Sequence, residues 1–451
     1  MRAPYSPVQW LTRCSHEQLK VSHQVLGRIV FLLFALHGVF YFNFFVLSGF
    51  LAKRIKDWDV IWGLISLILF STISTTALAF VRRRNYRVFY ISHIAIANII
   101  ILPLWLHVSH LRIFVYEIIL VEALHIAFRA LRLKTHQGTI RLLPGTNLVQ
   151  LRIPLEEGNS ALKWRPGQHV YLSRPWMKGL RPSLYSPNPF TIASIPSLDK
   201  ELLLVARTLG GNTKYLADLA RTLAQGGSGV PMLPTAGGDI PIIPIALEGP
   251  YGASTRLPDL SDYDRVLFVA GGVGATFIMP LYRSISNLHD PTPSGTKIRC
   301  IWAVQKLADT QWAFSTSSPE DTADAETDGS GLLHGASAVE VYVTRPSGPS
   351  QQVDRSFAVG EDDDETEGIE MAENEQLLSM EEQMDKPKKG MVIKSGRPKL
   401  DAIVDDVFSK GMRTAVICCG PKRLTGDLKR SVEVWVKKGH EVFWWDETFG
   451  W

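Results

Sequence analysis

The sequence predicts a multidomain protein with an α-helical membrane part, an antiparallel β-barrel and a doubly wound α/β domain. Three observations predict it. Residues 24 to about 131 are mostly apolar. Short β-rich runs separated by turns follow from about residue 138. Beyond residue 264, apolar strands alternate with helical segments and glycine-rich turns. The 451 residues are enough for two or three domains.

The membrane part consists of four apolar segments, at about 24–50, 59–81, 88–108 and 113–131. Each is about as long as the ~20 residues that a helix needs to cross a bilayer. Buried helices of a soluble protein are the alternative, but four such segments in succession, nearly free of charge, favour membrane helices. Residues 1–20 contain no apolar run, so we expect a cytosolic segment there rather than a signal peptide.

Basic residues predict the orientation of these helices. One basic cluster lies at 82–87 and another at 129–134, and both are expected on the cytoplasmic side. Four spans then place both chain ends inside. The loop 53–59 would lie outside although it holds three basic residues, and its two aspartates reduce this conflict.

Four histidines occur in these segments at one repeated spacing. His23 and His37 are fourteen residues apart, as are His93 and His107. Fourteen residues correspond to ~21 Å of helix and nearly four turns, so each pair faces one way. Because the first and third helices run in the same direction, His23 is expected beside His93 at the inner level and His37 beside His107 at the outer level. Imidazole is a common haem ligand, which predicts two stacked bis-histidine haems. Hydrogen bonding to a neighbouring helix is the alternative for a membrane histidine.

The region after residue 138 is expected to form the barrel. Residues 202–220 then read as a strand, a glycine turn and a helix, with Gly211 and Thr213 at the helix start. Backbone N–H groups at such a position bind anions, here a pyrophosphate. An ordinary strand–helix turn is the alternative.

A second glycine-rich turn begins the α/β domain. An apolar strand at 265–270 leads into Gly271, Gly272 and Gly274 and then a helix. Glycines let the backbone approach a phosphate closely. Residues 298–305 and 414–421 read as further parallel strands, and the latter ends in Cys419-Gly420-Pro421. Ligands of such sheets bind at the carboxyl ends of the strands.

Composition argues against several other classes of protein and of binding site. The net charge of +4 is too small to indicate nucleic-acid binding. The four cysteines show no spacing typical of a disulfide framework or a zinc site, which favours a reducing compartment for the soluble part.

Residues 313–392 are rich in Ser, Asp, Glu and Gly, so we expect a disordered acidic insertion.

The order of these elements resembles the ferric reductase and NADPH oxidase superfamily, particularly the fungal ferric-chelate reductases. The matching elements are the two histidine-bearing helices, PFTIAS (189–194), EGPYG (248–252), GGVGAT (271–276), CGP (419–421) and FGW (449–451). The resemblance implies a bis-haem transmembrane domain at 21–134 and a ferredoxin-reductase-like module. In that module, the FAD-binding barrel spans 136–255 and the NADPH-binding domain spans 260–451.

The resemblance also implies roles for individual residues. The FAD contacts would be Pro189, Phe190 and Thr191, with Gly211 and Thr213 at the pyrophosphate. The NADPH contacts would be Gly271, Gly272 and Gly274 at the phosphates and Cys419, Gly420 and Pro421 beside the nicotinamide. Cys419 and the terminal Trp451, which would cover the flavin, are the expected catalytic residues.

The chain departs from the family pattern in two places. Asn188 stands where the flavin motif usually has histidine, and asparagine can donate a hydrogen bond but carries no charge. The family usually has six or seven membrane helices, whereas four are predicted here.

The implied activity is electron transfer from cytosolic NADPH, through FAD and two b-type haems, to a ferric or cupric chelate outside. This would serve iron uptake at the plasma membrane, with an iron permease or oxidase as a partner. A superoxide-generating NADPH oxidase and a shortened, non-catalytic membrane relative are the alternatives. Superoxide yield and haem absorbance separate the three.

Overall fold

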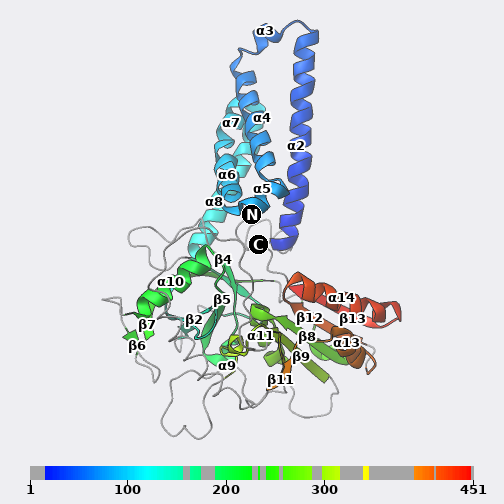
Figure 1. Cartoon of the computed structure of the whole chain (residues 1–451). Coiled ribbons are helices and arrows are strands. Elements are labelled where there is room, and N and C mark those ends of the chain that lie inside the picture. Colours follow the sequence, from blue (N-terminus) through cyan, green and yellow to red (C-terminus); the bar gives the residue numbers. More distant parts are fainter. Residues whose placement is uncertain are drawn as a thin grey trace, which may run out of the picture. The chain divides into compact units, whose positions relative to one another are not determined.

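The computed structural model describes residues 16–155, 163–173, 188–225, 232–233, 240–252, 257–286, 297–314, 339–344, 391–410 and 413–447 (Figure 1). The chain divides after Arg132 into two compact units, Met1–Arg132 and Leu133–Trp451. The first is helical, and the second contains two β-sheets.

The helical unit follows the predicted apolar segments closely. Its helices are α2 (His16–Leu47), α3 (Leu51–Arg54), α4 (Trp58–Thr76), α5 (Ala79–Arg84), α6 (Tyr86–Ile99), α7 (Ile101–His107) and α8 (Arg112–Arg132), with a short 3-10 turn, η1 (Ser109–Leu111). The third predicted segment is divided between α6 and α7. Proline clashes with the carbonyl four residues earlier, and for Pro103 that residue is Ile99, where α6 ends.

Three stretches of the described residues are long and apolar enough to cross a membrane: Val21–Leu47, Trp58–Thr76 and Val88–His107. Large apolar side chains such as Leu33, Phe40 and Ile68 are more than half exposed along them, as expected for helices surrounded by lipid. The fourth predicted span exists as the helix α8. It is not among these stretches, and it carries Glu117 and Glu122 within its apolar sequence.

The first sheet of the second unit is the predicted antiparallel barrel. Its strands are β1 (Leu133–Leu142), β2 (Leu148–Pro154), β3 (His169–Ser173), β4 (Asn188–Thr191), β5 (Glu201–Arg207), β6 (Met232–Leu233) and β7 (Ile240–Tyr251). The order is β4-β3-β7-β1-β2-β5, with β6 paired to β7. A bridge between Ile192 and Leu204 joins the two ends, so the sheet closes on itself.

One helix covers part of this barrel. α10 (Asn212–Ala224) buries Leu216, Ala217, Ala220 and Leu223, which lie on one helical face. These residues pack in the same core as the inward residues of β2 and β5, such as Leu151 and Leu204.

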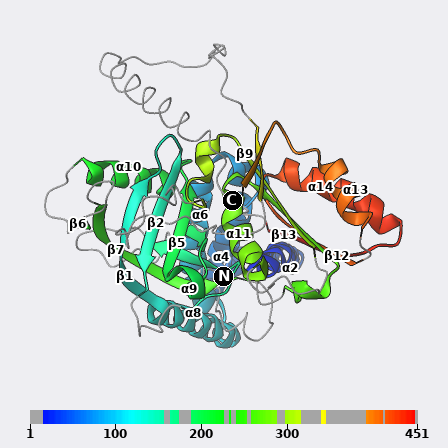
Figure 2. The same ribbon diagram turned by 90° about the horizontal axis from the view of Figure 1, so that it is seen from below.

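The second sheet is parallel throughout. Its strands are β8 (Arg265–Gly271), β9 (Lys297–Val304), β10 (Val339–Val343), β11 (Met391–Ser395), β12 (Arg413–Cys419) and β13 (Glu441–Glu447), in the order β11-β10-β9-β8-β12-β13. The helix α11 (Ala275–Ser286) packs on one face. α13 (Leu400–Phe408) and α14 (Lys422–Lys437) pack on the other (Figure 2). The chain order reverses between β8 and β12, which makes this edge the switch point where ligands of such sheets bind.

The prediction that residues 313–392 form a disordered insertion is wrong at three places. Ala313 and Phe314 are fully buried, and two strands, β10 and β11, lie within or across the limits of 313–392. The run Val339–Val343 is rich in β-branched residues, but an average over eighty residues hides so short a strand. The rest of this interval, with the acidic run 361–365, lies outside the described residues.

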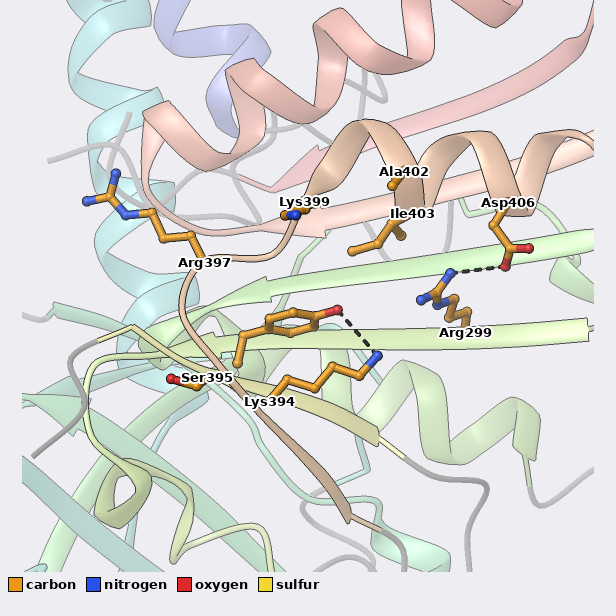
Figure 3. Close-up of a pocket in the computed structure, with 9 residues that line it drawn as sticks. Arg299, Lys394, Ser395, Arg397, Lys399, Ala402, Ile403 and Asp406 are labelled. Carbon is orange, nitrogen blue, oxygen red and sulfur yellow. Dashed lines mark hydrogen bonds and ion pairs between the residues drawn. The ribbon is translucent and has the colours of Figure 1, made fainter.

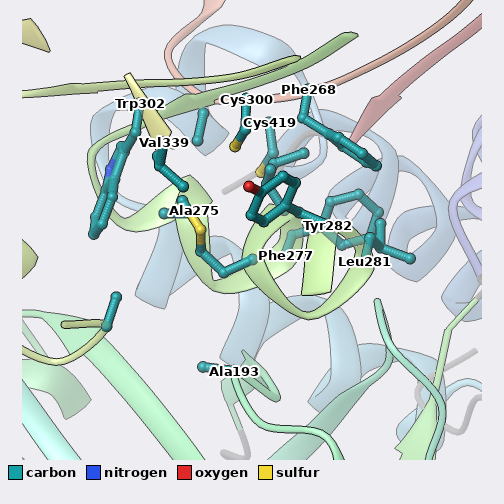
Figure 4. Close-up of a cluster of buried hydrophobic side chains, with 14 of the residues drawn as sticks. Ala193, Phe268, Ala275, Phe277, Leu281, Tyr282, Cys300, Trp302, Val339 and Cys419 are labelled. Atoms are coloured by element: carbon teal, nitrogen blue, oxygen red, sulfur yellow. The ribbon is translucent and has the colours of Figure 1, made fainter. Parts of the chain in front are cut away.

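A few residues of the barrel region pack into one of the hydrophobic cores of the parallel sheet. Leu148 and Ala193 of the barrel region belong to the same cluster as Phe268 and Phe277. Ala193, Phe268 and Phe277 are labelled in Figure 4. Three small elements complete this unit: the helix α9 (Pro196–Asp199) and the 3-10 turns η3 (Leu260–Asp262) and η5 (Leu307–Thr310).

A buried ion pair connects the same two sheets. Asp199 at the end of α9 receives two hydrogen bonds from the Arg283 guanidinium of α11, of 2.6 and 2.8 Å. The two side chains are 9% and 8% exposed. The two sheets therefore form one body.

Candidate functional site

The four histidines that were predicted to bind haem form the two predicted pairs. The ring centres of His23 (α2) and His93 (α6) are 6.1 Å apart, and the ring planes are inclined by 86°. Those of His37 (α2) and His107 (α7) are 6.4 Å apart and inclined by 89°. The break between α6 and α7 leaves both pairs intact.

This spacing fits one metal ion between the two rings of each pair. Metal–imidazole bonds of about 2.1 Å, with about 1.1 Å from each nitrogen to its ring centre, place the centres about 6.4 Å apart. A direct imidazole–imidazole hydrogen bond would bring the rings closer. Both pairs therefore suit axial ligation of an iron ion. No group of three or more candidate metal ligands occurs among the described residues.

The predicted flavin motif lies on β4 and just beyond it. Phe190 and Thr191 are buried, whereas Asn188 and Pro189 are partly exposed. β4 pairs with β3, so that Val170 stands opposite Phe190. The motif therefore has one side in the barrel core and another accessible to a ligand.

The predicted pyrophosphate turn is open. Gly211 adopts φ +58°, and a Cβ added at Gly210 or Gly211 would meet nothing within 4 Å. The Thr213 hydroxyl accepts a hydrogen bond from the Leu209 N–H and donates one to the Gly210 carbonyl. Thr213 therefore holds the shape of the turn, and the glycines leave room for a phosphate at the start of the thirteen-residue helix α10.

The second glycine loop packs directly against the Cys419-Gly420-Pro421 element. A Cβ on Gly271 would lie 2.6 Å from Pro421 Cδ, and a Cβ on Gly274 would lie 2.3 Å from the Cys419 carbonyl oxygen. Gly272, by contrast, has φ +54° and open space beside it. Two of the glycines are thus required for packing, and Gly272 is the one with access to a phosphate.

Burial keeps the cysteines of this element protonated. Burial first, and then the nearby Glu447, raise the pKa of the Cys419 thiol well above its ordinary value. The pKa of Cys418 is raised for the same reason, with Asp446 nearby. Cys419 is therefore a neutral thiol and not a thiolate nucleophile, and its fully buried side chain packs in the core at the end of β12.

Three residues that hold predicted site residues in place were not predicted from the sequence. Trp302 donates a hydrogen bond from Nε1 to the Gly272 carbonyl at 2.9 Å and so orients the loop. The Asp59 carbonyl and Gly63 surround the ring of His107. A contact to a backbone carbonyl, or the absence of a side chain at a glycine, leaves no motif in a sequence. Asp59 and Gly63 could therefore not be predicted from it.

A cavity of about 420 Å³ lies elsewhere in the second unit, between the sheet and α13 (Figure 3). Its lining is Arg299, Tyr342, Lys394, Ser395, Arg397, Lys399, Ala402, Ile403 and Asp406. Arg299 binds Glu340 and Asp406, and Lys394 binds Glu340. None of the predicted site residues lines this cavity. The predicted Trp451 lies outside the described residues.

Three family models match the chain in order. "Ferric reductase like transmembrane component" matches residues 1–104, "FAD-binding domain" matches 132–255 and "Ferric reductase NAD binding domain" matches 263–433. The sequence therefore carries FAD-binding and NAD-binding domains behind a membrane domain, as the resemblance implied.

Several curated fungal proteins are similar along the chain. A probable cell surface ferric reductase of Aspergillus oryzae is 25% identical over 68% of this chain and 41% of its own length. A probable metalloreductase of Scheffersomyces stipitis is 23% identical over 95% of this chain and 73% of its own. A ferric/cupric reductase transmembrane component of Schizosaccharomyces pombe is 25% identical over 65% and 56%. The match thus covers about half the length of such relatives.

Solved structures show a loose similarity. The ferredoxin reductase in carbazole 1,9a-dioxygenase has a TM-score of 0.36 at 13% identity, covering 70% of each chain. Phthalate dioxygenase reductase has a TM-score of 0.37 at 11% identity, covering 70% of this chain and 68% of its own. The three family models, in the same order as the sequence motifs, show that this integral membrane chain carries a ferric-reductase-like transmembrane domain, an FAD-binding domain and a ferric reductase NAD-binding domain.

Proposed function

We propose that this protein transfers electrons across a membrane from NADPH to a ferric chelate. The observation that carries the proposal is the pair of histidine couples, with ring centres 6.1 and 6.4 Å apart. His23 and His37 lie on one helix, fourteen residues or ~21 Å apart along its axis. Two b-type haems held this way would lie one above the other.

The helical unit would hold and separate the two irons. His23 and His93 would hold one haem, and His37 and His107 would hold the other. When bound, the haems would supply one-electron chemistry and FAD would supply the step between a hydride and single electrons. The apolar residues of the surrounding helices would keep water away from this path within a membrane.

The second unit would bind the flavin and the nicotinamide nucleotide. Pro189, Phe190 and Thr191 are proposed to contact the flavin. Gly211 would contact its pyrophosphate, and Thr213 would shape that turn. Gly271, Gly272 and Gly274 would cradle the NADPH phosphates, with Gly272 the most accessible.

Three residues are proposed to position the nicotinamide. Cys419 is the last residue of β12, and Gly420 and Pro421 follow it at the switch point of the sheet. Their close packing against Gly271 and Gly274 would keep them fixed beside a bound nicotinamide. Trp451 is proposed to cover the flavin. The preference for NADPH over NADH follows the family resemblance.

The acceptor is proposed to be a ferric chelate, with cupric ion as a second substrate. The basic clusters at 82–87 and 129–134 favour a cytosolic position for the nucleotide-binding unit and an acceptor on the opposite side. The plasma membrane, and an iron permease or oxidase partner, complete the proposal. Ferric reductases occur among the relatives by name.

Reduced-minus-oxidised spectroscopy of membranes that contain the full chain tests the proposal. NADPH should produce a b-type haem spectrum that a ferric chelate then reverses. A preparation without a dithionite-sensitive haem signal would contradict electron transfer and favour a non-catalytic membrane relative. Superoxide formation without chelate reduction would instead identify an NADPH oxidase.

A further inference from the structure

The ring of His107 is held by two backbone features of α4. Its Nδ1–H donates a hydrogen bond to the Asp59 carbonyl, with an N···O distance of 2.6 Å. The Cα of Gly63 lies against the same ring. A Cβ added there would be 2.6 Å from Cε1 of His107 and 2.9 Å from its Nδ1. Any residue other than glycine would therefore displace the imidazole.

These two features have one geometric cause. In an α-helix the carbonyl of residue 59 accepts the N–H of residue 63, so Asp59 and Gly63 are hydrogen-bonded partners. A carbonyl oxygen has a second lone pair, which can accept a side-chain donor. The side chain four residues later ordinarily crowds the approach to that lone pair. Glycine at 63 leaves the approach open, and the His107 ring occupies it.

The hydrogen bond also decides which nitrogen of His107 can bind a metal. The Asp59 carbonyl can only accept, so Nδ1 carries the proton and Nε2 has the free lone pair. Metal-binding histidines usually donate their second nitrogen in this way, which fixes both the tautomer and the ring plane. We propose that the Asp59 carbonyl and Gly63 are positioning groups that present Nε2 of His107 to the haem shared with His37. This inference rests on the proposed function.

The other histidine pair lacks this arrangement. Nδ1 of His93 is buried and has no hydrogen-bond partner among the described residues. Among the described residues, this constraint on ring orientation is therefore present at His107 and absent at His93. A change at Gly63 should affect that haem and leave the other haem in place.

The first turn of α4 is itself anchored. Arg54 of α3 forms ion pairs with Asp57 at 2.6 Å and with Asp59 at 3.4 Å. These pairs are about 40% exposed and contribute little stability, but they limit the movement of the turn that offers the carbonyl.

The test is Gly63→Ala in the full chain, purified from membranes. Gly38→Ala is the matched control. It is also a helical glycine, and its added Cβ would meet only the flexible tip of Leu67, at 3.1 Å. Three quantities are measured: the haem content per polypeptide, the EPR spectrum of the oxidised protein, and the haem redox potentials by potentiometric titration. Wild type and Gly38→Ala should hold two haems, whereas Gly63→Ala should hold one or bind the second about 10–100-fold more weakly.

A double variant separates positioning from general packing. If Gly63 acts through His107, Gly63→Ala added to His107→Ala should cause no further loss of haem and no change in the remaining EPR signal. Two haems with an unchanged EPR spectrum and unchanged potentials in Gly63→Ala would overturn the inference. Equal haem loss in Gly38→Ala and Gly63→Ala would also overturn it. A wild-type protein without haem would instead refute the proposed function. The haem content of the wild type is therefore measured before the variants are compared.

Discussion

The ion pair between Asp199 and Arg283 offers the most direct test of how the second unit is held together. Asp199 belongs to α9 beside the barrel, and Arg283 belongs to α11 of the parallel sheet. The Asp199 carboxylate also accepts a hydrogen bond from the Ile195 N–H at 2.6 Å. The change Asp199→Asn removes the charge with almost no change in volume.

The expected loss follows from the burial of the pair. With side chains 8% and 9% exposed, the Arg283 guanidinium would remain buried without a counter-charge. Loss of one partner of a buried pair costs about 3–5 kcal/mol. Asparagine keeps one acceptor oxygen, so we expect the lower end, about 3 kcal/mol. At about 2–4 °C per kcal/mol, the unfolding midpoint of this unit should fall by at least about 6 °C.

Thermal unfolding of the full chain in detergent measures the effect, with flavin release as the signal for the second unit. Asp218→Asn is the control. Asp218 also binds an arginine, Arg221, but this pair is about half exposed and should contribute at most about 1 kcal/mol. A second measurement is the rate of flavin reduction by NADPH, because a shift of ~1 Å between the two sheets can slow such a step ~100-fold.

Equal midpoints for Asp199→Asn and wild type would refute the reasoning. So would equal shifts in Asp199→Asn and Asp218→Asn, because burial would then have no measurable effect. The double variant Asp199→Leu with Arg283→Met adds a further check. It should be more stable than Asp199→Asn, because it leaves no buried charge unpaired.

Three further predictions concern other parts of the chain. His37→Ala should lose one of two haems and nearly all chelate reduction, measured by haem content and ferrous-ion assay, while flavin reduction by NADPH persists. Gly274→Ala should destabilise the nucleotide-binding sheet by about 1–3 kcal/mol and weaken NADPH binding, measured by unfolding and titration, because its Cβ would lie 2.3 Å from the Cys419 carbonyl. Glu340→Gln should cost about 1–2 kcal/mol at neutral pH, measured by unfolding at several pH values, since the two basic partners of Glu340 are only partly buried.

The sign of the pH effect follows from the pKa of Glu340. Burial alone would raise this pKa, but hydrogen bonds from Arg299 and Lys394 outweigh burial and lower it below its ordinary value of 4.5. The stabilisation is therefore complete above about pH 4.5 and is lost as the pH falls through the lowered pKa. The difference between wild type and Glu340→Gln should shrink below pH 4.5. A difference that grew there would contradict the assignment.

The controls for His37→Ala and Gly274→Ala are His110→Ala and Gly272→Ala. His110→Ala changes an exposed histidine close to His107 and should retain both haems. Gly272→Ala is a control for the unfolding measurement only, because Gly272 is itself a proposed phosphate contact. Its Cβ would stand in open space at φ +54°, so a backbone strain of about 1–2 kcal/mol, without any clash, is its expected cost in stability. Full chelate reduction by His37→Ala, or a normal unfolding midpoint for Gly274→Ala, would contradict the corresponding prediction.

Local patterns in the sequence predicted much of this architecture. The apolar segments located the helices of the membrane unit, because a bilayer demands about 20 apolar residues in succession. The alternation of strands and helices predicted the parallel sheet. The fourteen-residue spacing and the basic clusters predicted which histidines pair, since helical periodicity and orientation suffice for that. The roles of the flavin and nucleotide residues stay predictions.

Other features depended on contacts between residues far apart in the chain. Composition could not reveal the strand Val339–Val343, because its neighbours in the sheet come from distant segments. Nor could it reveal the ion pair of Asp199 with Arg283, which are eighty-four residues apart. The Asp59 carbonyl and the missing side chain of Gly63 have no sequence signal of their own. Periodicity and composition thus determined the elements and the histidine pairs, while tertiary packing decided how each ring and loop is held.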